Sequence, residues 1–436
     1  MRLSAEKVGD NPKAGVLVVP VVSIICLIVM GCGSVPAAIV SDGGLDADSD
    51  TDSDTDTDTD SDTDQAPDSS AKDDASVDEL PPWEWIDNPE GEFCGDECEQ
   101  LTFAYHVAEQ EWDVWEGYLV FRDDTGAVNV VDVEAGKSMR IPDVYPEYSI
   151  ETGVSTTSWP TIYKNSIYYA LSIYGADPPR REIIHADFKA QTQELVWRRE
   201  EAKDLFYCMP ESLDVYGERL VSKCGAGDPE VRTLSAFEPP WPSTGEVLIE
   251  ESYGGYNSIW ENVAVFWDDR EDPSNISGYD FDTGEFVSII SDAQYQYAPR
   301  IQGRRVVYMD FREGKSNPWG SWAGAKVVVY DLDKATRFPL TGGNWIAAHP
   351  DIYEDVAVWM DYRGCGSQKK GNLACVEIWG FNLETLTRFQ ITYLEGRPKT
   401  YPRIWKNKVF MHMFAEDYST DAIYMVALPE EGRGDS

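Results

Sequence analysis

The chain has 436 residues, and its 78 Asp and Glu against 36 Lys and Arg give a formal net charge of −42. The charge is uneven: residues 1–40 carry +1, residues 41–80 carry −15 and the remainder carries −28. Such an acidic chain, without a basic run to offset it, repels phosphate backbones, which excludes nucleic-acid binding.

The N-terminus has the pattern of an export signal. Arg2, Lys7 and Lys13 precede an apolar run over residues 14–30, AGVLVVPVVSIICLIVM. Basic residues followed by an apolar run are typical of a secretory signal peptide, expected here over residues 1–31. An uncleaved membrane helix is the alternative, because seventeen apolar residues nearly span a bilayer.

A lipid-attachment motif ends this segment. The sequence Val29-Met30-Gly31-Cys32 resembles the bacterial lipobox. The resemblance implies cleavage before Cys32 and acylation of that residue, which anchors the chain in a membrane. Gly33 stands where the lipoprotein family places Asp for inner-membrane retention. We therefore expect an outer-membrane lipoprotein that faces the periplasm or the cell surface.

An acidic, low-complexity segment follows. From Ser49 to Asp64 every second residue is Asp, alternating with Ser or Thr. Such a segment has no apolar area to bury, so residues 32–92 are predicted to be a disordered, self-repelling stalk. Weak calcium binding by the Asp ladder is an alternative, although the alternation lacks the turning Gly of a calcium loop.

A repeat occupies residues 93–431. One pattern recurs seven times: a polar residue, a β-branched anchor, a residue that is usually aromatic, a two-residue turn and an apolar strand. The seven stretches are Asp113–Phe121, Thr161–Tyr169, Asp214–Ser222, Ser258–Phe266, Arg300–Tyr308, Asp351–Trp359 and Arg403–Met411. Their anchors lie 42 to 53 residues apart. A β-type repeat with a period near fifty predicts an all-β, seven-bladed propeller with four-stranded antiparallel blades.

The two ends of the repeat complement each other. The seventh unit stops after Asp421–Leu428, leaves a tail over residues 432–436 and lacks an outer strand. The segment Glu99–His106 has the pattern of a fourth strand and precedes the first unit. We predict that it completes the last blade, closes the ring and removes an open sheet edge.

Two recurring features are predicted to be structural. The residue after the anchor is aromatic in six of the seven repeats and is expected to pack between neighbouring blades. An Asp-x-Arg follows the second strand of three consecutive repeats, at Asp268, Asp310 and Asp361. We expect each carboxylate to bind loop amides and each guanidinium to reach the next blade.

The residue before the anchor does not follow the pattern of these two structural features. It is polar in every repeat, yet its charge varies: Asp113, Thr161, Asp214, Ser258, Arg300, Asp351 and Arg403. If the first strand is innermost, these positions and His349 crowd the channel mouth and form a candidate binding site. A water-filled channel with a polar lining is the alternative.

One family shares the pattern. Pro299-Arg300-Ile301 followed by Arg305–Arg312, and Pro350-Asp351-Ile352 followed by Val356–Arg363, resemble the WD40-like repeat of TolB-type propellers. TolB resembles a six-bladed ring, whereas seven repeats are counted here. The resemblance implies a rigid, exported ring that binds proteins or small ligands at its channel mouth.

The cysteines agree with export. Beyond Cys32, six fall into close pairs: Cys94 with Cys98, Cys208 with Cys224 and Cys365 with Cys375. Close pairs in an oxidising compartment predict disulfides. Metal binding is the alternative, but these pairs have neither the two-residue Cys spacing nor the nearby His of a zinc site.

Catalytic motifs do not emerge from the sequence. It contains neither a Gly-x-Ser-x-Gly elbow nor His-Glu-x-x-His nor a phosphate loop. By register His106 falls on an outer strand, His185 on a third strand and His412 on a second strand, so no metal site, catalytic residue or cofactor is predicted. We expect a monomeric, lipid-anchored scaffold for an envelope protein or small ligand. A carbohydrate-active enzyme, a polysaccharide lyase or hydrolase with its site at the channel mouth, is the alternative.

Overall fold

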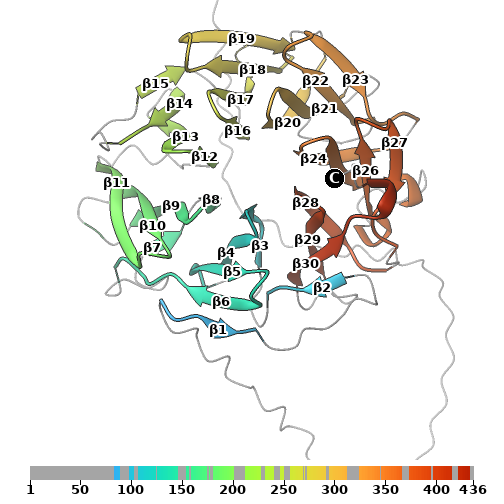
Figure 1. Cartoon of the computed structure of the whole chain (residues 1–436). Coiled ribbons are helices and arrows are strands. Elements are labelled where there is room, and N and C mark those ends of the chain that lie inside the picture. Colours follow the sequence, from blue (N-terminus) through green and yellow to red (C-terminus); the bar gives the residue numbers. More distant parts are fainter. Residues whose placement is uncertain are drawn as a thin grey trace, which may run out of the picture. The chain divides into compact units, whose positions relative to one another are not determined.

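Seven antiparallel sheets surround one central channel in the computed structural model (Figure 1). The structure describes residues 83–88, 98–102, 107–123, 125–145, 154–156, 159–173, 176, 180–200, 212–226, 231–239, 246–249, 256–268, 270, 273–290, 294–311, 324–343, 345–365, 373–393, 396–414 and 421–432. The predicted signal, the lipid-attachment site at Cys32 and the Asp-rich tract lie outside these residues. The described residues all belong to one compact unit, residues 75–436.

The first strand of each blade lies closest to the channel, and the later strands follow outward. Blade one contains β3 (Val107–Trp115), β4 (Tyr118–Asp123), β5 (Val128–Asp132) and β6 (Lys137–Arg140). Blade two contains β7 (Val154–Thr156) and β8 (Thr161–Tyr163), which both pair with β9 (Ser166–Ile173), then β10 (Arg180–Asp187) and β11 (Thr192–Glu200). Blade three contains β12 (Leu213–Tyr216), β13 (Arg219–Ala226), β14 (Val231–Phe237) and β15 (Glu246–Ile249).

The other blades repeat this order. Blade four contains β16 (Asn257–Trp260), β17 (Val263–Asp268), β18 (Asn275–Asp280) and β19 (Glu285–Ile290). Blade five contains β20 (Gln296–Gln302), β21 (Arg305–Asp310), β22 (Lys326–Asp331) and β23 (Thr336–Pro339). Blade six contains β24 (Ala347–Tyr353), β25 (Val356–Asp361), β26 (Glu377–Asn382) and β27 (Thr387–Gln390). Blade seven contains β28 (Lys399–Trp405), β29 (Lys408–Phe414) and β30 (Asp421–Ala427). The predicted seven-bladed propeller is confirmed.

The N-terminal strand of the propeller closes the last blade. Strand β2 (Cys98–Gln100) pairs antiparallel with β30, as the sequence predicts. Beyond it, the backbone N–H of Leu101 donates to the carbonyl of Ile423 at 2.8 Å. The N–H of Ile423 in turn donates to Oγ1 of Thr102 at 3.0 Å. The first and last strands of the ring are therefore joined by both backbone and side-chain hydrogen bonds.

One part of the predicted stalk is a strand instead. Strand β1 (Ile86–Asp87) pairs antiparallel with β6 and gives blade one a fifth strand. The sequence here contains two tryptophans, unlike the Asp-Ser-Thr tract, and Trp83 and Trp85 pack against the core between blades one and two. Burial of these indoles offsets the entropy of ordering the segment, which the Asp-rich tract cannot do.

The core is divided among the blade interfaces. Each of the seven interfaces has its own cluster of buried aliphatic and aromatic side chains. Strands such as β25 are buried along their whole length because a blade covers each face. This explains the near-continuous apolar runs of the second strands, where an exposed sheet would show alternation.

Two-residue turns join the first and second strands of the blades. Pairs such as Trp115 with Tyr118 and Tyr353 with Val356 leave two residues between the strands, as predicted. The residue with positive φ is the first of the turn: Glu116, Lys164, Glu261, Glu354 and Lys406 have φ between 47° and 57°. The second residue also has a positive φ at Gly117, whereas the Asn or Asp at the second position of the other four turns does not.

The helices of the described residues are short 3-10 turns: η2 (Arg363–Cys365), η3 (Leu373–Cys375) and η4 (Glu430–Gly432). Among the residues described, no helix has the length and apolar character to cross a membrane.

Candidate functional site

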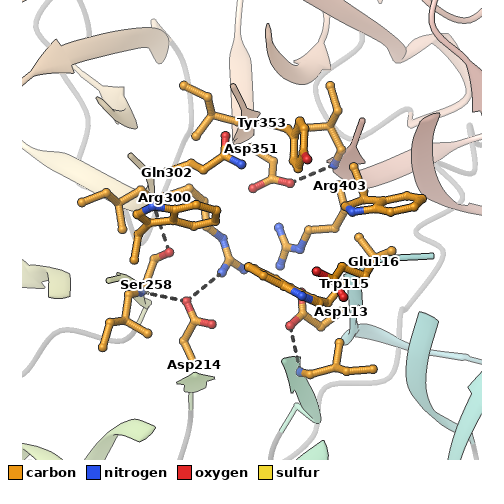
Figure 2. Close-up of a pocket in the computed structure, with 18 of the residues that line it drawn as sticks. Asp113, Trp115, Glu116, Asp214, Ser258, Arg300, Gln302, Asp351, Tyr353 and Arg403 are labelled. Carbon is orange, nitrogen blue, oxygen red and sulfur yellow. Dashed lines mark hydrogen bonds and ion pairs between the residues drawn. The ribbon is translucent and has the colours of Figure 1, made fainter. Parts of the chain in front are cut away.

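The polar residues before the anchors meet around one cavity at the centre of the ring. The cavity has a volume of about 510 Å³, and Asp113, Asp214, Ser258, Arg300, Asp351 and Arg403 line it. These six residues come from six different blades (Figure 2). The seventh, Thr161, is buried behind them and donates from Oγ1 to Oδ2 of Asp113 at 2.9 Å. Of the eight residues predicted at the channel mouth, six thus line this cavity and Thr161 lies directly behind them.

Four of these residues join neighbouring blades. Each offers a side-chain oxygen to the backbone N–H of the anchor residue in the next blade. The four hydrogen bonds run from Ile162 to Asp113 at 3.2 Å, from Ile259 to Asp214 at 3.0 Å, from Ile301 to Ser258 at 3.3 Å, and from Ile404 to Asp351 at 2.9 Å. We call these four contacts the latches. They give the Asp and Ser residues an architectural role that the sequence pattern did not reveal.

The two arginines cannot form such a latch, because a guanidinium has no hydrogen-bond acceptor. Figure 2 shows Arg300 and Arg403 projecting into the cavity from facing walls. Nη1 of Arg300 lies 3.9 Å from Oδ2 of Asp214. None of the described residues forms an ion pair with Arg403, and its Nε is buried without a hydrogen-bond partner among them. Its guanidinium lies 5.7 Å from the ring centre of Trp112.

Burial changes the acidity of these groups. It raises the pKa of Asp214 to about 6, helped by Asp113 and opposed by Arg300. Burial also raises the pKa of Asp351, although Arg403 and Arg300 act in the other direction. The pKa of Arg403 falls to about 10 through burial and repulsion by Arg300. Two cations and three carboxylates therefore share a poorly solvated chamber.

Aromatic side chains form part of the cavity wall. Trp115, Trp260, Tyr353 and Trp405 line it, two positions after the polar residue of their strands. Trp115 of blade one contacts Trp260 of blade four across the channel, with ring centres 5.7 Å apart. Tyr163 and Tyr216 join this cluster. Each ring also packs into an interface with the next blade, as predicted.

The fifth blade interrupts this aromatic series. Gln302 stands where the other six blades carry Trp or Tyr, and it lines the cavity. Its Oε1 accepts a hydrogen bond from the backbone N–H of Glu354. The turn residues Glu116 and Lys406 also line the cavity, which places its mouth at the turn end of the first strands.

His349 lies away from this cavity lining. It is buried two residues before Asp351, at a left-handed position with φ 48°. Its ring packs against Tyr401 at 4.6 Å and faces Tyr256 at 6.5 Å. Burial, with Arg403 and Arg300 nearby, lowers the pKa of His349 to about 3, so its imidazole stays neutral. With Trp159, these rings form an aromatic layer at positions two before the polar residues.

The other histidines do not gather near it. His185 on β10 contacts Glu194 at 2.9 Å, and His412 on β29 contacts Asp421 at 2.9 Å. Both lie on the strands that the sequence predicts, whereas His106 lies outside the described residues. Within the ranges that the structure describes, no group of three His, Cys, Asp or Glu side chains could hold a metal ion.

Two of the three Asp-x-Arg motifs close within themselves, and Arg312 of the third lies outside the described residues. Arg363 donates from Nε and Nη2 to both carboxylate oxygens of Asp361, at 2.8 and 2.7 Å. Arg270 and Asp268 pair in the same way. The Arg363 guanidinium stacks 3.6 Å from the ring centre of Trp379 in its own blade. The prediction that it reaches the next blade is wrong, because two residues are short enough to close a bidentate ring locally.

The predicted disulfides are confirmed in part. Cys365 and Cys375 are bonded and join the ends of the loop between β25 and β26. Cys98 is also disulfide-bonded, while its predicted partner Cys94 lies outside the described residues. The pairing of Cys208 with Cys224 stays a prediction, because Cys208 lies outside them as well.

The cavity wall contains residues that the sequence analysis did not assign to a site. Side chains two apart on a strand share a face, so Trp115 had to accompany Asp113. The same reasoning would have placed Gln302 with Arg300. The alternation of side chains along a strand was therefore the sequence signal that could have assigned these residues to the cavity.

Comparisons with known proteins support the fold. No family model matches the chain, and no curated protein matches it. An oligogalacturonate lyase in complex with manganese matches with a TM-score of 0.54 and 10% identity, covering 81% of this chain and 99% of that one. A prolyl endopeptidase matches with a TM-score of 0.52 and 10% identity, covering 75% of this chain and 50% of that one.

TolB from Acinetobacter baumannii also matches, with a TM-score of 0.36 and 12% identity, covering 76% of this chain and 63% of that one. The part of this chain that the structure describes has no group of three His, Cys, Asp or Glu side chains that could hold manganese. At 10% identity, the likeness to the lyase and to the prolyl endopeptidase extends to the fold alone.

Proposed function

We propose that this protein is a lipid-anchored propeller of the bacterial cell envelope that serves as a binding scaffold and holds a small ligand in its central cavity. The observation that carries the proposal is the cavity itself. Its volume of about 510 Å³ suits a small molecule, and two guanidiniums project into it from facing walls (Figure 2). Six blades contribute one polar residue each, so the site exists only in the closed ring.

The latches favour binding over a catalytic role for the carboxylates. Asp113, Ser258 and Asp351 each accept a backbone N–H from the neighbouring blade. Such a contact holds an oxygen in place and stabilises the ring. The guanidiniums of Arg300 and Arg403 are therefore the groups that we expect to bind a ligand.

Sequence features support the location. The lipobox-like Val29-Met30-Gly31-Cys32 would supply the anchor, and the Asp-rich tract would supply a solvated spacer. The disulfide between Cys365 and Cys375 fits an oxidising compartment outside the cytoplasm.

Gln302→Trp tests the site; it removes the oxygen that accepts the N–H of Glu354, so far-UV circular dichroism first checks that the variant folds. The other six blades already carry an aromatic residue at this position, so a ring here follows the repeat and narrows the cavity mouth. Leu386→Trp is the control, because it adds the same side chain at a turn where Leu386 is 65% exposed.

The full-length protein and both variants are incubated with a small-molecule extract of the cell envelope and examined by native mass spectrometry. We expect a ligand mass on the parent and on Leu386→Trp that is lost from Gln302→Trp. Equal retention by all three proteins, or no retained mass on the parent, would contradict the proposal.

A further inference from the structure

The positions of Arg300 and Arg403 suggest the chemistry of the ligand. Blades one, three, four and six use Asp or Ser at this position to latch the next blade. Blades five and seven carry Arg, which cannot accept an N–H. These two blades therefore lack a latch of this kind, and the requirements of the ring do not explain their arginines.

The arginines are only loosely paired with the carboxylates around them. Arg300 has one carboxylate oxygen at 3.9 Å, near the limit for an ion pair, and that carboxylate of Asp214 already accepts the N–H of Ile259 at 3.0 Å. Arg403 forms no ion pair with any described residue, and its buried Nε finds no acceptor among them. Two cations that face one cavity repel each other, and burial strengthens that repulsion. An anion placed between them would relieve it and complete their hydrogen bonds.

The rest of the wall selects among anions. Asp113, Asp214 and Asp351 present carboxylate oxygens, which accept hydrogen bonds from hydroxyl groups. Trp115, Trp260, Tyr353 and Trp405 present ring surface, which packs against carbon. A bare inorganic anion would satisfy the arginines but would leave the carboxylates facing another negative charge without a donor between them.

Building on the proposed function, we propose that the cavity binds a small hydroxylated carboxylic acid, with its carboxylate groups between Arg300 and Arg403 and its hydroxyl groups on the surrounding aspartates. The carboxylates form charge-assisted hydrogen bonds with the guanidinium forks. The hydroxyl groups separate the ligand charge from the aspartates, and the carbon skeleton contacts the aromatic wall.

Tartrate and threitol form a matched pair of probes, because both have four carbons and the same two inner hydroxyls, and only tartrate has carboxylates. Inorganic phosphate provides an anion without hydroxylated carbon. Binding to the full-length protein in detergent is followed by tryptophan fluorescence, since three tryptophans line the cavity, and by titration calorimetry. We expect tartrate to bind more tightly than phosphate and threitol not to bind.

Arg403→Gln and Arg300→Gln remove one guanidinium each, and we expect each to weaken tartrate binding about tenfold or more. Arg304→Gln is the control, because Arg304 pairs with Asp333 at 2.9 Å on the surface and does not line the cavity. Far-UV circular dichroism checks that each variant folds. The threitol comparison needs no variant, so it remains informative even if one fails to fold.

Three outcomes would overturn the inference: no tartrate binding to the parent up to tens of millimolar, threitol binding as well as tartrate, or equal affinity in Arg403→Gln, Arg300→Gln and Arg304→Gln. If tartrate fails while an extract ligand is still lost from Gln302→Trp, the cavity remains a site and only the ligand class is wrong. If both experiments fail, the proposed function fails as well.

Discussion

Oδ2 of Asp351 in blade six accepts a hydrogen bond from the backbone N–H of Ile404 in blade seven, across 2.9 Å. The same relationship recurs at three other blade boundaries, where Asp113, Asp214 and Ser258 provide the oxygen. The channel wall and the joints between blades are therefore built from the same side chains. A mutation of a latch residue therefore affects both binding and stability.

Asp351→Ala should lower the free energy of unfolding by about 1–3 kcal/mol, because it leaves the N–H of Ile404 without its acceptor. Asp351→Asn also removes the charge but keeps an amide oxygen at the same place, so it should cost less. Chemical denaturation followed by circular dichroism measures both. Equal losses in the two variants would mean that the charge, and not the latch, is what stabilises the ring.

Asp214 should make both stability and binding depend on pH. Its folded pKa of about 6 lies above the ordinary value of 3.8, so the folded state holds this proton more tightly than the unfolded chain. Its contribution to stability is therefore greatest below pH 4 and is lost as the pH rises through about 6. Arg300, Asp113, Thr161 and Ser258 face this carboxylate and set its ionisation.

The same proton should govern anion affinity. When Asp214 is protonated the cavity is less negative, so tartrate should bind more tightly at pH 5 than at pH 7 (two points that bracket the shifted pKa). Asp214→Asn, which is neutral at every pH, should flatten this dependence. Calorimetric titrations at the two pH values measure the tartrate affinity. An unchanged ratio of the two affinities in the variant would show that another group titrates.

Leu101→Ala tests the closure of the ring. Leu101 is 2% exposed and packs in the cluster between blades seven and one. Truncating a buried Leu costs about 2–5 kcal/mol, so we expect a loss of that size in the free energy of unfolding. Leu386→Ala, at an exposed turn, should change it little, and similar losses in the two variants would argue against a packed closure strand.

The disulfide between Cys365 and Cys375 should stabilise the loop of blade six. It closes a short loop with a sequence separation of 10, so Cys365→Ser with Cys375→Ser should lower the free energy of unfolding by about 2–3 kcal/mol. Reductant should destabilise the parent more than the double variant, which keeps the disulfide of Cys98. An equal reductant effect on the two proteins would show that the bond between Cys365 and Cys375 adds no stability.

Cys32→Ser should release the protein from membranes. If the lipobox-like sequence directs acylation, the parent will sediment with the membrane fraction and incorporate labelled fatty acid. The variant should lose the label and appear in the supernatant after cell fractionation. A variant that stays in the membrane fraction would favour the uncleaved apolar helix over residues 14–30.

Much of the fold could be predicted because the repeat expresses it directly. A β-branched anchor such as Ile352 and a turn such as Glu354-Asp355 recur in every unit. Each blade packs between two neighbours in the same way, so the same residue types recur. Strand β1 could not be predicted in this way. It is two residues long and belongs to no repeat. Its position depends on the packing of Trp83 and Trp85 against the core between blades one and two, which is a tertiary contact.

The site was predictable by position but not by role. Innermost first strands place Asp113 or Arg403 at the channel whatever their chemistry. The latches depend on how closely the next blade approaches, which is a tertiary distance that no local pattern contains. His349 shows the same limit: it lies two positions before Asp351, but the left-handed turn of the backbone at φ 48° moves its ring into a different layer.

The short β1 strand has a mechanical consequence. Any tension that reaches the propeller through the preceding chain arrives first at Trp83, whose N–H donates to Arg140 and whose carbonyl accepts from Gln191. These contacts spread the load over blades one and two. Because β1 precedes β2 in the chain, β2 is loaded only once these contacts have broken. A pull on the chain N-terminal to Trp83 would thus detach β1 from β6 before it could open the ring.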